Sequence, residues 1–210
     1  MVLEKAKEED KQFHKDIDTD FLEYETKYSV GEGAVYLFKD LMETSEEVRD
    51  FLYVEGDDIY YSKGEAFLRH RLPTKASPRS ELTHKSKPKE AINNVARTEV
   101  NLKVTKNDLE TVKKFTEVLG FKYNFRITKY CHIYYTKDAN LVFYSIKDHD
   151  GRKVTRDHYI EIEVNEDLAT ELTKEECKEI IRKWETFLEP LGVKYQKRLY
   201  RQLFDIYRKF

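Results

Sequence analysis

Charged residues that recur in pairs, two positions apart, are the residues of this sequence best suited to chemistry. The pairs are Glu23 and Glu25, Arg69 and Arg71, Lys85 and Lys87, Arg97 and Glu99, and Glu161 and Glu163. One uncharged residue separates the two members of each pair. Because successive side chains of a β-strand point to opposite faces, both charges of a pair lie on the same face. The spacing therefore predicts five strands that each carry a charged face.

The alternation by itself fits a charged face in water as well as it fits a charged interior. The distribution of the signs favours the interior, because two pairs are wholly acidic and two are wholly basic, whereas solvated faces usually mix the signs. Carboxylates supply hard oxygen ligands for Mg²⁺ or Mn²⁺, and lysine and arginine bind phosphate oxygens. The separation of acids from bases thus indicates a site for a polyphosphate and a divalent metal ion.

The first pair lies within a motif, Glu23-Tyr24-Glu25-Thr26-Lys27, that resembles the E-x-E-x-K signature of the CYTH, or triphosphate tunnel metalloenzyme, superfamily. This superfamily includes thiamine triphosphatases, tripolyphosphatases, class IV adenylate cyclases and, more remotely, the metal-dependent RNA triphosphatases of mRNA capping. Further segments resemble the family in the same order, at 58–61, 67–71, 82–87, 97–99, 119–121, 159–163 and 199–204. The resemblance covers nearly the whole chain.

The resemblance implies an α+β fold, in which about eight antiparallel strands form a closed β-barrel with a charged tunnel interior and peripheral helices. A single domain is expected over residues 1–210, with a charged lead-in at 1–19. Apolar spacing predicts helices over 34–43, 108–119, 174–188 and 197–210, and a strand that begins at Phe21. Thr173 and Glu176 have the spacing of a capping box at the start of the third of these helices.

The resemblance also implies a role for each charged group. The expected metal ligands are Glu23, Glu25, Glu161 and Glu163. The expected phosphate-binding residues are Lys27, Arg69, Arg71, Lys85, Lys87, Arg97 and Arg126, of which Lys27, Arg69 and Lys85 are expected to act in catalysis. Where the family usually has K-x-R followed by a tyrosine, this chain has the segment 126–130, and Arg126 is chosen there ahead of Lys129. Glu99 is expected to bind metal or to orient a base.

The implied activity is hydrolysis of a triphosphate with Mg²⁺ or Mn²⁺ as the cofactor, in which the basic side chains offset the charge that develops on the phosphate. The motifs leave four substrates open: inorganic tripolyphosphate, thiamine triphosphate, a nucleoside triphosphate and an RNA 5′ end. One alternative is cyclisation of ATP to cyclic AMP and pyrophosphate. A second alternative is a protein that binds phosphorylated ligands without catalysis.

The composition limits the kinds of protein that this chain is expected to be. Lysine and arginine number 38 against 40 aspartates and glutamates, and a net charge of −2 argues against binding to nucleic acid or a membrane through overall charge. There is no apolar stretch of membrane-spanning length and no signal-peptide core in residues 1–15. Cys131 and Cys177 lack metal-ligand spacing, which favours reduced thiols in the cytoplasm. The expected protein is a monomer or homodimer with Trp184 in its core.

Overall fold

The structure is a computed structural model that describes residues 17–73, 79–85, 96–105, 109–154, 157–193, 199 and 202–208. Within these ranges the side chains at 17–23, 73, 79, 85, 96–99 and 105 are outside the description. Residues 1–16 of the expected lead-in and the expected phosphate ligand Lys87 also lie outside the described residues.

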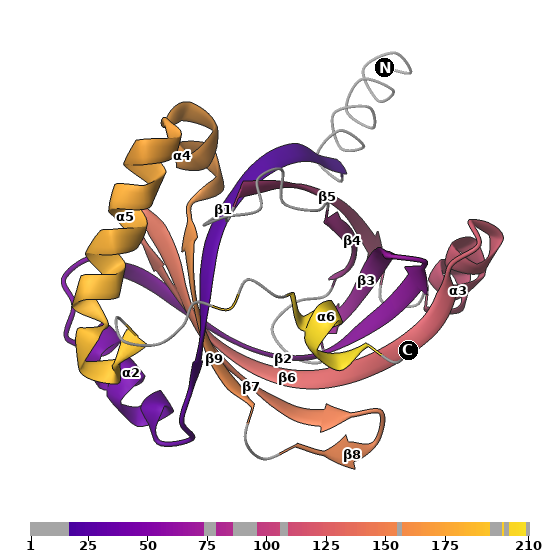
Figure 1. Ribbon diagram of the computed structural model, residues 1–210, viewed down its shortest axis with the longest axis horizontal. Coiled ribbons are helices and arrows are strands. Elements are labelled where there is room, and N and C mark those ends of the chain that lie inside the picture. Colours follow the sequence, from indigo (N-terminus) through magenta and orange to yellow (C-terminus); the bar gives the residue numbers. More distant parts are fainter. Residues whose placement is uncertain are drawn as a thin grey trace, which may run out of the picture.

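Nine β-strands form one sheet in the described part of the chain (Figure 1). They are β1 (Ile17–Val30), β2 (Val48–Lys63), β3 (Ala66–Pro73), β4 (Arg79–Lys85), β5 (Ala96–Thr105), β6 (Lys122–Thr136), β7 (Ala139–His149), β8 (Arg152–Lys153) and β9 (His158–Val164). All of their pairings are antiparallel.

The pairings of eight of these strands run around a complete ring. Neighbours pair in the order β6-β2-β3-β4-β5-β1-β9-β7, and β6 pairs with β7 as well as with β2. The short β8 extends β7 outside the ring. Figure 1 shows the strands curving around a central space. The expected α+β fold, with antiparallel strands around a tunnel-like interior, is confirmed.

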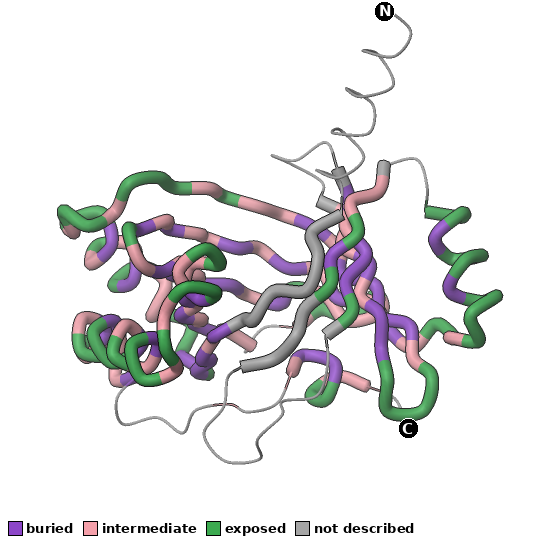
Figure 2. The backbone as a smooth tube through the Cα atoms, turned by 90° about the horizontal axis from the view of Figure 1, so that it is seen from above, coloured by how far each residue is buried: buried purple, intermediate pink, exposed green. Residues whose placement is uncertain are grey.

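Buried and less buried residues alternate along the strands of the ring, as Figure 2 shows. Along β6 the alternation is nearly strict from Asn124 to Cys131. Such a pattern is expected where both faces of a strand are covered to different degrees, one by the interior of the ring and the other by helices or solvent. The same alternation decides which side chains reach the interior.

The helices lie outside the ring, except for the last one. They are α2 (Ala34–Glu43), α3 (Leu109–Val118), α4 (Glu166–Glu171), α5 (Lys174–Phe187) and α6 (Leu203–Tyr207), with a 3₁₀ turn, η1, at Glu189–Leu191. The capping box is present at α5, where the Thr173 side chain accepts from the Glu176 amide and the Glu176 carboxylate accepts from the Thr173 amide. It fixes the start of the helix that carries Trp184.

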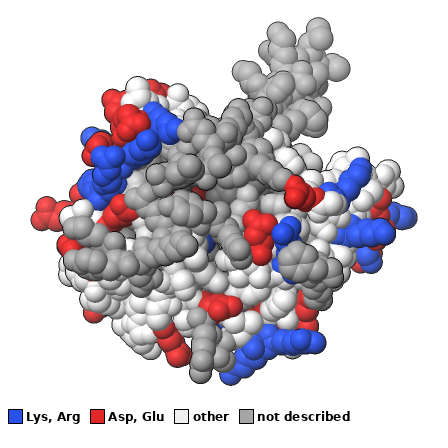
Figure 3. Space-filling view, in the orientation of Figure 1, with Lys and Arg blue, Asp and Glu red and all other residues white. Residues whose placement is uncertain are grey.

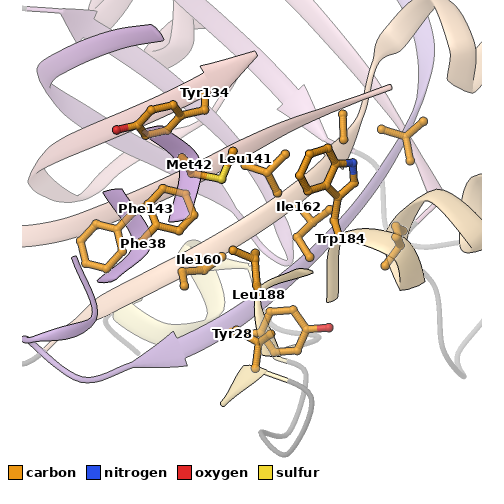
Figure 4. Close-up of a cluster of buried hydrophobic side chains, with 14 of the residues drawn as sticks. Tyr28, Phe38, Met42, Tyr134, Leu141, Phe143, Ile160, Ile162, Trp184 and Leu188 are labelled. Carbon is orange, nitrogen blue, oxygen red and sulfur yellow. The ribbon is translucent and has the colours of Figure 1, made fainter. Parts of the chain in front are cut away.

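The largest hydrophobic cluster joins α2 and α5 to the outer faces of β1, β6, β7 and β9 (Figure 4). Trp184 is fully buried there, as expected from the sequence, and Phe38 packs at 5.7 Å from Tyr134 and 5.8 Å from Phe143 between ring centroids. Burying large aromatic side chains contributes much of the stability of such a core. This half of the barrel is therefore anchored from outside by helices.

A second cluster surrounds Phe204 of α6. Its ring stacks on Phe67 at 4.6 Å, and Tyr60 stacks on Phe125 at 4.5 Å beside it. A third, smaller cluster packs Val112 of α3 against Leu68 and Leu82. The C-terminal segment is thus held by aromatic contacts with the ring.

Two expected boundaries are corrected by the structure. The first strand begins at Ile17 instead of Phe21, because an irregularity in the β1–β5 register between Asp18 and Phe21 accommodates the polar residues that interrupted the pattern. In the described part of the C-terminal tail, the helix covers Leu203–Tyr207 alone, and Leu199 precedes it as non-helical chain. No described helix is long and apolar enough to span a membrane. The cytoplasmic location and the oligomeric state stay predictions.

Candidate functional site

A cavity of about 260 Å³ lies inside the ring, and each of the eight ring strands contributes to its lining. Residues 202–204 of the C-terminal segment line it as well, in agreement with the position of α6 across the central space in Figure 1. Among the described side chains, the charged residues that line it are Glu25, Lys27, Arg69, Arg71, Glu81, Lys129, Glu161 and Glu163. Four acids and four bases therefore meet in one small space.

The acidic wall of the cavity is built by β1 and β9. Their antiparallel register places Glu25 opposite Glu163 and Lys27 opposite Glu161. Directly opposed side chains on one face of an antiparallel pair have Cβ atoms roughly 4.5–5.5 Å apart. The two neighbouring carboxylates Glu25 and Glu163 are therefore well placed to bind a divalent cation, which would relieve their mutual repulsion.

Glu161 connects this wall to a base. Its Oε1 lies 2.8 Å from Lys27 Nζ and accepts a hydrogen bond from the Tyr144 hydroxyl at 2.9 Å. Burial and the Glu161 carboxylate raise the pKa of Tyr144, so its hydroxyl stays protonated and donates. Lys27 is only 7% exposed. A buried ammonium of this kind needs an anion as its partner, either Glu161 or a bound phosphate.

The basic wall includes Arg69 of β3. Its Nη2 lies 3.3 Å from Glu81 Oε1 and donates to Thr83 Oγ1 at 3.1 Å. The Thr83 hydroxyl in turn lies 2.7 Å from Asn101 Oδ1. These contacts hold the planar guanidinium against β4 and leave its orientation fixed toward the cavity that it lines.

Asp58 of β2 joins two further bases of this wall. Its Oδ1 accepts from Arg71 Nε at 3.0 Å, and its Oδ2 lies 2.8 Å from Lys129 Nζ. Asp58 is 0% exposed. Burial alone would raise the pKa of this carboxyl, but the attraction of Arg71 and Lys129 outweighs burial and lowers it well below its usual value. Burial and the neighbouring Arg71 lower the pKa of Lys129, while Asp58 opposes this change.

The acidic and basic walls lie across the ring from each other. Four steps along the ring separate β3 from β9 in either direction. Arg69 and Arg71 on β3 therefore lie opposite Glu161 and Glu163 on β9. Figure 3 shows that, on the outer surface in this view, acidic and basic groups lie close together, so that neither sign covers the surface. Inside the ring the signs are only partly separated, because Lys27 lies on the acidic wall and Glu81 on the basic wall.

Of the residues predicted from sequence, the structure brings six together in the cavity: Glu25, Lys27, Arg69, Arg71, Glu161 and Glu163. The backbone of Glu23 pairs with that of Arg97, and the backbone of Lys85 with that of Glu99, but these four side chains lie outside the described set.

Among the predicted residues whose side chains are described, Arg126 does not line the cavity. Residues of β6 alternate between two faces, and Lys129 and Cys131 take the inner one. Arg126 is on the outer face, with its guanidinium 3.7 Å from Asp57 and 3.8 Å from Asp148. The structure thus places Lys129, the base not chosen from the sequence, in the interior at this strand.

Sequence reasoning also missed the polar residues that hold the bases in place, which are Asp58, Glu81, Thr83, Asn101 and Tyr144. Asp58 begins one of the segments that resemble the family, and Glu81 and Thr83 share the odd-numbered spacing of Lys85 on the same strand. These signals were present. These positions did not indicate a function by themselves, because single acidic or hydroxyl residues are common in β-strands.

The described side chains contain no group of three or more histidines, cysteines, aspartates or glutamates arranged to hold a metal ion. Glu25 and Glu163 offer the oxygen donors that Mg²⁺ and Mn²⁺ prefer, and Glu161 adjoins them on β9. Glu23 precedes Glu25 by two positions on β1, and its side chain lies outside those described. The donor chemistry fits a divalent cation at this wall.

Several solved structures share this fold over most of their length, and three of them come from Pyrococcus and Vibrio species. A conserved hypothetical protein from Pyrococcus furiosus matches with a TM-score of 0.63 and 24% identity, over 85% of this chain and 97% of its own. The PH1012 protein from Pyrococcus horikoshii OT3 matches with a TM-score of 0.61 and 22% identity, over 80% of this chain and 90% of its own. A putative adenylate cyclase from Vibrio parahaemolyticus matches with a TM-score of 0.58 and 17% identity, over 89% of this chain and 97% of its own.

No protein-family model matches the sequence, and no curated protein matches it. The class is therefore defined by the fold, an antiparallel ring of strands around a tunnel-like interior that this chain shares over most of its length with the three proteins above. These likenesses establish a shared fold, and that fold is the α+β arrangement expected from the sequence.

Proposed function

We propose that the ring binds a triphosphate together with Mg²⁺ or Mn²⁺ and hydrolyses it with release of phosphate. The observation that supports this most strongly is the cavity in which Glu25 and Glu163 lie across the ring from Arg69 and Arg71. Carboxylates on one wall suit a divalent cation, and guanidinium groups on the other suit phosphate oxygens. A polyphosphate with a bound metal ion offers both the cation for the carboxylates and the phosphate oxygens for the guanidinium groups.

The size of the cavity supports a compact ligand. Pockets for organic ligands commonly measure roughly 300–1,000 Å³. A volume of about 260 Å³ suits a phosphate chain and leaves little room for an organic group attached to it. A base or a thiazolium group would therefore extend beyond this cavity, and inorganic tripolyphosphate is the substrate that fits without such an extension.

The basic side chains are proposed to act directly on the phosphate. Lys27 and Arg69 offset the charge that develops on the transferred phosphoryl group, and Lys85 is expected to join them. Arg71 and Lys129, on the basic wall, bind the remaining phosphate groups of the substrate. An incoming phosphate competes with Glu161 for Lys27, because both are anions within reach of one ammonium.

The acidic side chains are proposed to hold the cation. Glu25 and Glu163 would bind it, with Glu23 and Glu161 as further carboxylates of the same two strands. When bound, such an ion neutralises phosphate oxygens and lowers the pKa of a coordinated water molecule. Glu161 becomes available for this role when a phosphate replaces it as the partner of Lys27.

Cyclisation of ATP is the second candidate, favoured by the likeness to the putative adenylate cyclase from Vibrio parahaemolyticus. The same charges would hold the triphosphate, with the ribose 3′-hydroxyl in place of water and pyrophosphate as the leaving group. The two activities differ in their products and not in the residues that bind the phosphates.

The test is a product assay with tripolyphosphate, thiamine triphosphate, ATP and RNA with a 5′-triphosphate, each with Mg²⁺, Mn²⁺ or EDTA. We expect orthophosphate to be released only when Mg²⁺ or Mn²⁺ is present. The kcat of Arg69→Met and of Glu163→Gln should be lower by about 100-fold or more. Arg182→Met is the matched control, since Arg182 is exposed on α5 and pairs with Glu179. Cyclic AMP and pyrophosphate from ATP would establish the cyclase instead. Tight binding without turnover would indicate a binding protein, and full activity of both cavity variants would refute the site.

A further inference from the structure

A second, larger hollow lies on the outside of the ring. It measures about 930 Å³ and is lined by outward-facing residues of β2, β6, β7 and β9 and by the β7–β8 hairpin. Tyr130 and His132 of its floor alternate with Lys129 and Cys131, which face the inner cavity. This outer groove is therefore separated from the tunnel by the wall of the barrel, and the proposed hydrolysis does not use it.

Aromatic rings form one continuous part of the floor. Tyr53 and Tyr130 are 6.1 Å apart between ring centroids and nearly parallel, at 14°. His132 lies 5.2 Å from Tyr53. Tyr53 is 36% exposed, so part of its ring is open to a ligand. Such rings form a stacking surface for a planar aromatic group.

The polar groups of the groove include two histidines. His158 Nδ1 lies 2.8 Å from Ser145 Oγ. Among the described residues, His158 Nε2 and His132 Nδ1 are buried nitrogens without a hydrogen-bond partner. Unpaired buried polar atoms cost stability, and the polar edge of a ligand on the floor would supply partners after a small rotation of either ring.

Two lysines lie on the side of the groove formed by the β7–β8 hairpin. Lys147 places its Nζ 3.7 Å from the centroid of the Tyr130 ring, and Lys153 follows on β8, both of them exposed. Three acids also line the groove, namely Glu32, Glu55 and Asp148. Arg126 lies 3.8 Å from Asp148 and offsets its charge, so the positive charge of the groove is confined to the hairpin. A cation next to a stacking surface is the combination that binds an aromatic ring with an attached phosphate.

From these contacts we propose that the outer groove is a nucleotide-binding site, with the base on Tyr53 and Tyr130 and the phosphate at Lys147 and Lys153. The volume of about 930 Å³ lies within the range of roughly 300–1,000 Å³ that is common for pockets that bind organic ligands. The inner cavity, at about 260 Å³, lies just below this range.

The test measures the binding of AMP, GMP, CMP and UMP to the full-length protein by calorimetry, with ribose 5-phosphate as the ligand that lacks a base. Loss of a stacking ring is worth about 1–3 kcal/mol per base, so Tyr53→Ala should weaken nucleotide binding about 5- to 150-fold. Lys147→Ala should weaken it too, and serves as the second variant if Tyr53→Ala folds poorly. Tyr36→Ala is the matched control, because Tyr36 is 75% exposed and does not line the groove.

We expect ribose 5-phosphate to bind much more weakly than the nucleotides, and both groove variants to keep their response to tripolyphosphate in the tunnel. Absence of nucleotide binding, or unchanged binding in both Tyr53→Ala and Lys147→Ala, would overturn the proposal. So would loss of nucleotide binding in Arg69→Met, since that result places the nucleotide in the tunnel. Much tighter binding of an oligoribonucleotide without a 5′-triphosphate would overturn the assignment to a single nucleotide.

Discussion

Replacement of Asp58 by asparagine should strongly destabilise the protein and at the same time increase its response to anions. The carboxylate is 0% exposed and is the shared counter-charge of two cations, with contacts of 3.0 Å to Arg71 and 2.8 Å to Lys129. Asparagine keeps the shape and removes the charge. The buried Lys129 and the partly exposed Arg71 are then left without this counter-charge.

The size of the effect follows from the burial of Asp58 and Lys129, which are 0% and 9% exposed. Removal of one partner from a buried ion pair costs about 3–5 kcal/mol, because the remaining charge stays desolvated. For a chain of this length, each kcal/mol lowers Tm by about 2–4 °C, so the expected decrease is about 6–20 °C. Asp205→Asn is the control, since Asp205 is exposed on α6.

The assay is thermal unfolding with and without tripolyphosphate. A bound polyphosphate supplies the negative charge that the variant lacks, so tripolyphosphate should raise the Tm of Asp58→Asn by more than it raises that of the unmodified protein. Stability within about 0.5 kcal/mol of the unmodified protein would show that Asp58 does not hold the two bases. Equal stabilisation by tripolyphosphate in both proteins would show that the ligand does not approach them.

Three further predictions concern stability in acid, the roles of Arg126 and Lys129 on β6, and the C-terminal segment. Because the folded-state pKa of Asp58 is lowered, its contribution to stability is complete above the unfolded pKa of about 3.9 and is lost as pH falls below it; Asp58→Asn should flatten the fall of unfolding free energy in that window. Lys129→Met should reduce triphosphate binding at least tenfold and Arg126→Met should reduce it far less, as measured by calorimetry; the reverse order would assign the phosphate contact to Arg126. Phe204→Ala should cost about 3–5 kcal/mol in urea unfolding, because Phe204 is 2% exposed and stacks on Phe67, and an unchanged midpoint would show that α6 does not support the ring.

The sequence predicted the inner faces of β1, β3 and β9, because their charged residues occupy alternate positions and the acidic and basic pairs lie on different strands. Periodicity does not decide the faces of β2 and β6 in the same way. Tyrosine and other apolar residues occur on both faces of these strands, since helices, the outer groove and α6 cover different parts of them. The choice between Arg126 and Lys129 depends on which face of β6 is inside, and that is fixed by the pairing with β2 and β7.

The ion pairs inside the cavity could not be predicted from the sequence. Separation of acids and bases by strand suggested two walls of opposite sign, but Lys27 contacts Glu161 and Arg69 contacts Glu81 across neighbouring strands. Opposite charges attract strongly at low dielectric, and which of them become neighbours depends on register. Register is a property of the assembled sheet, so the single-strand patterns contain no record of it.

The pairing of β1 with β9 has a consequence for the order in which the protein acquires its activity during folding. Glu25 and Glu163 are 138 residues apart along the chain (163 minus 25), yet they are register neighbours. Such a contact closes a long loop and is favoured late, after hairpins such as β2–β3 and β6–β7 have shortened the distance to be searched. The proposed cation site is thus completed by the contact that joins the first strand to the last one in the described chain. In a refolding experiment, cation binding would report the end of barrel assembly and not its beginning.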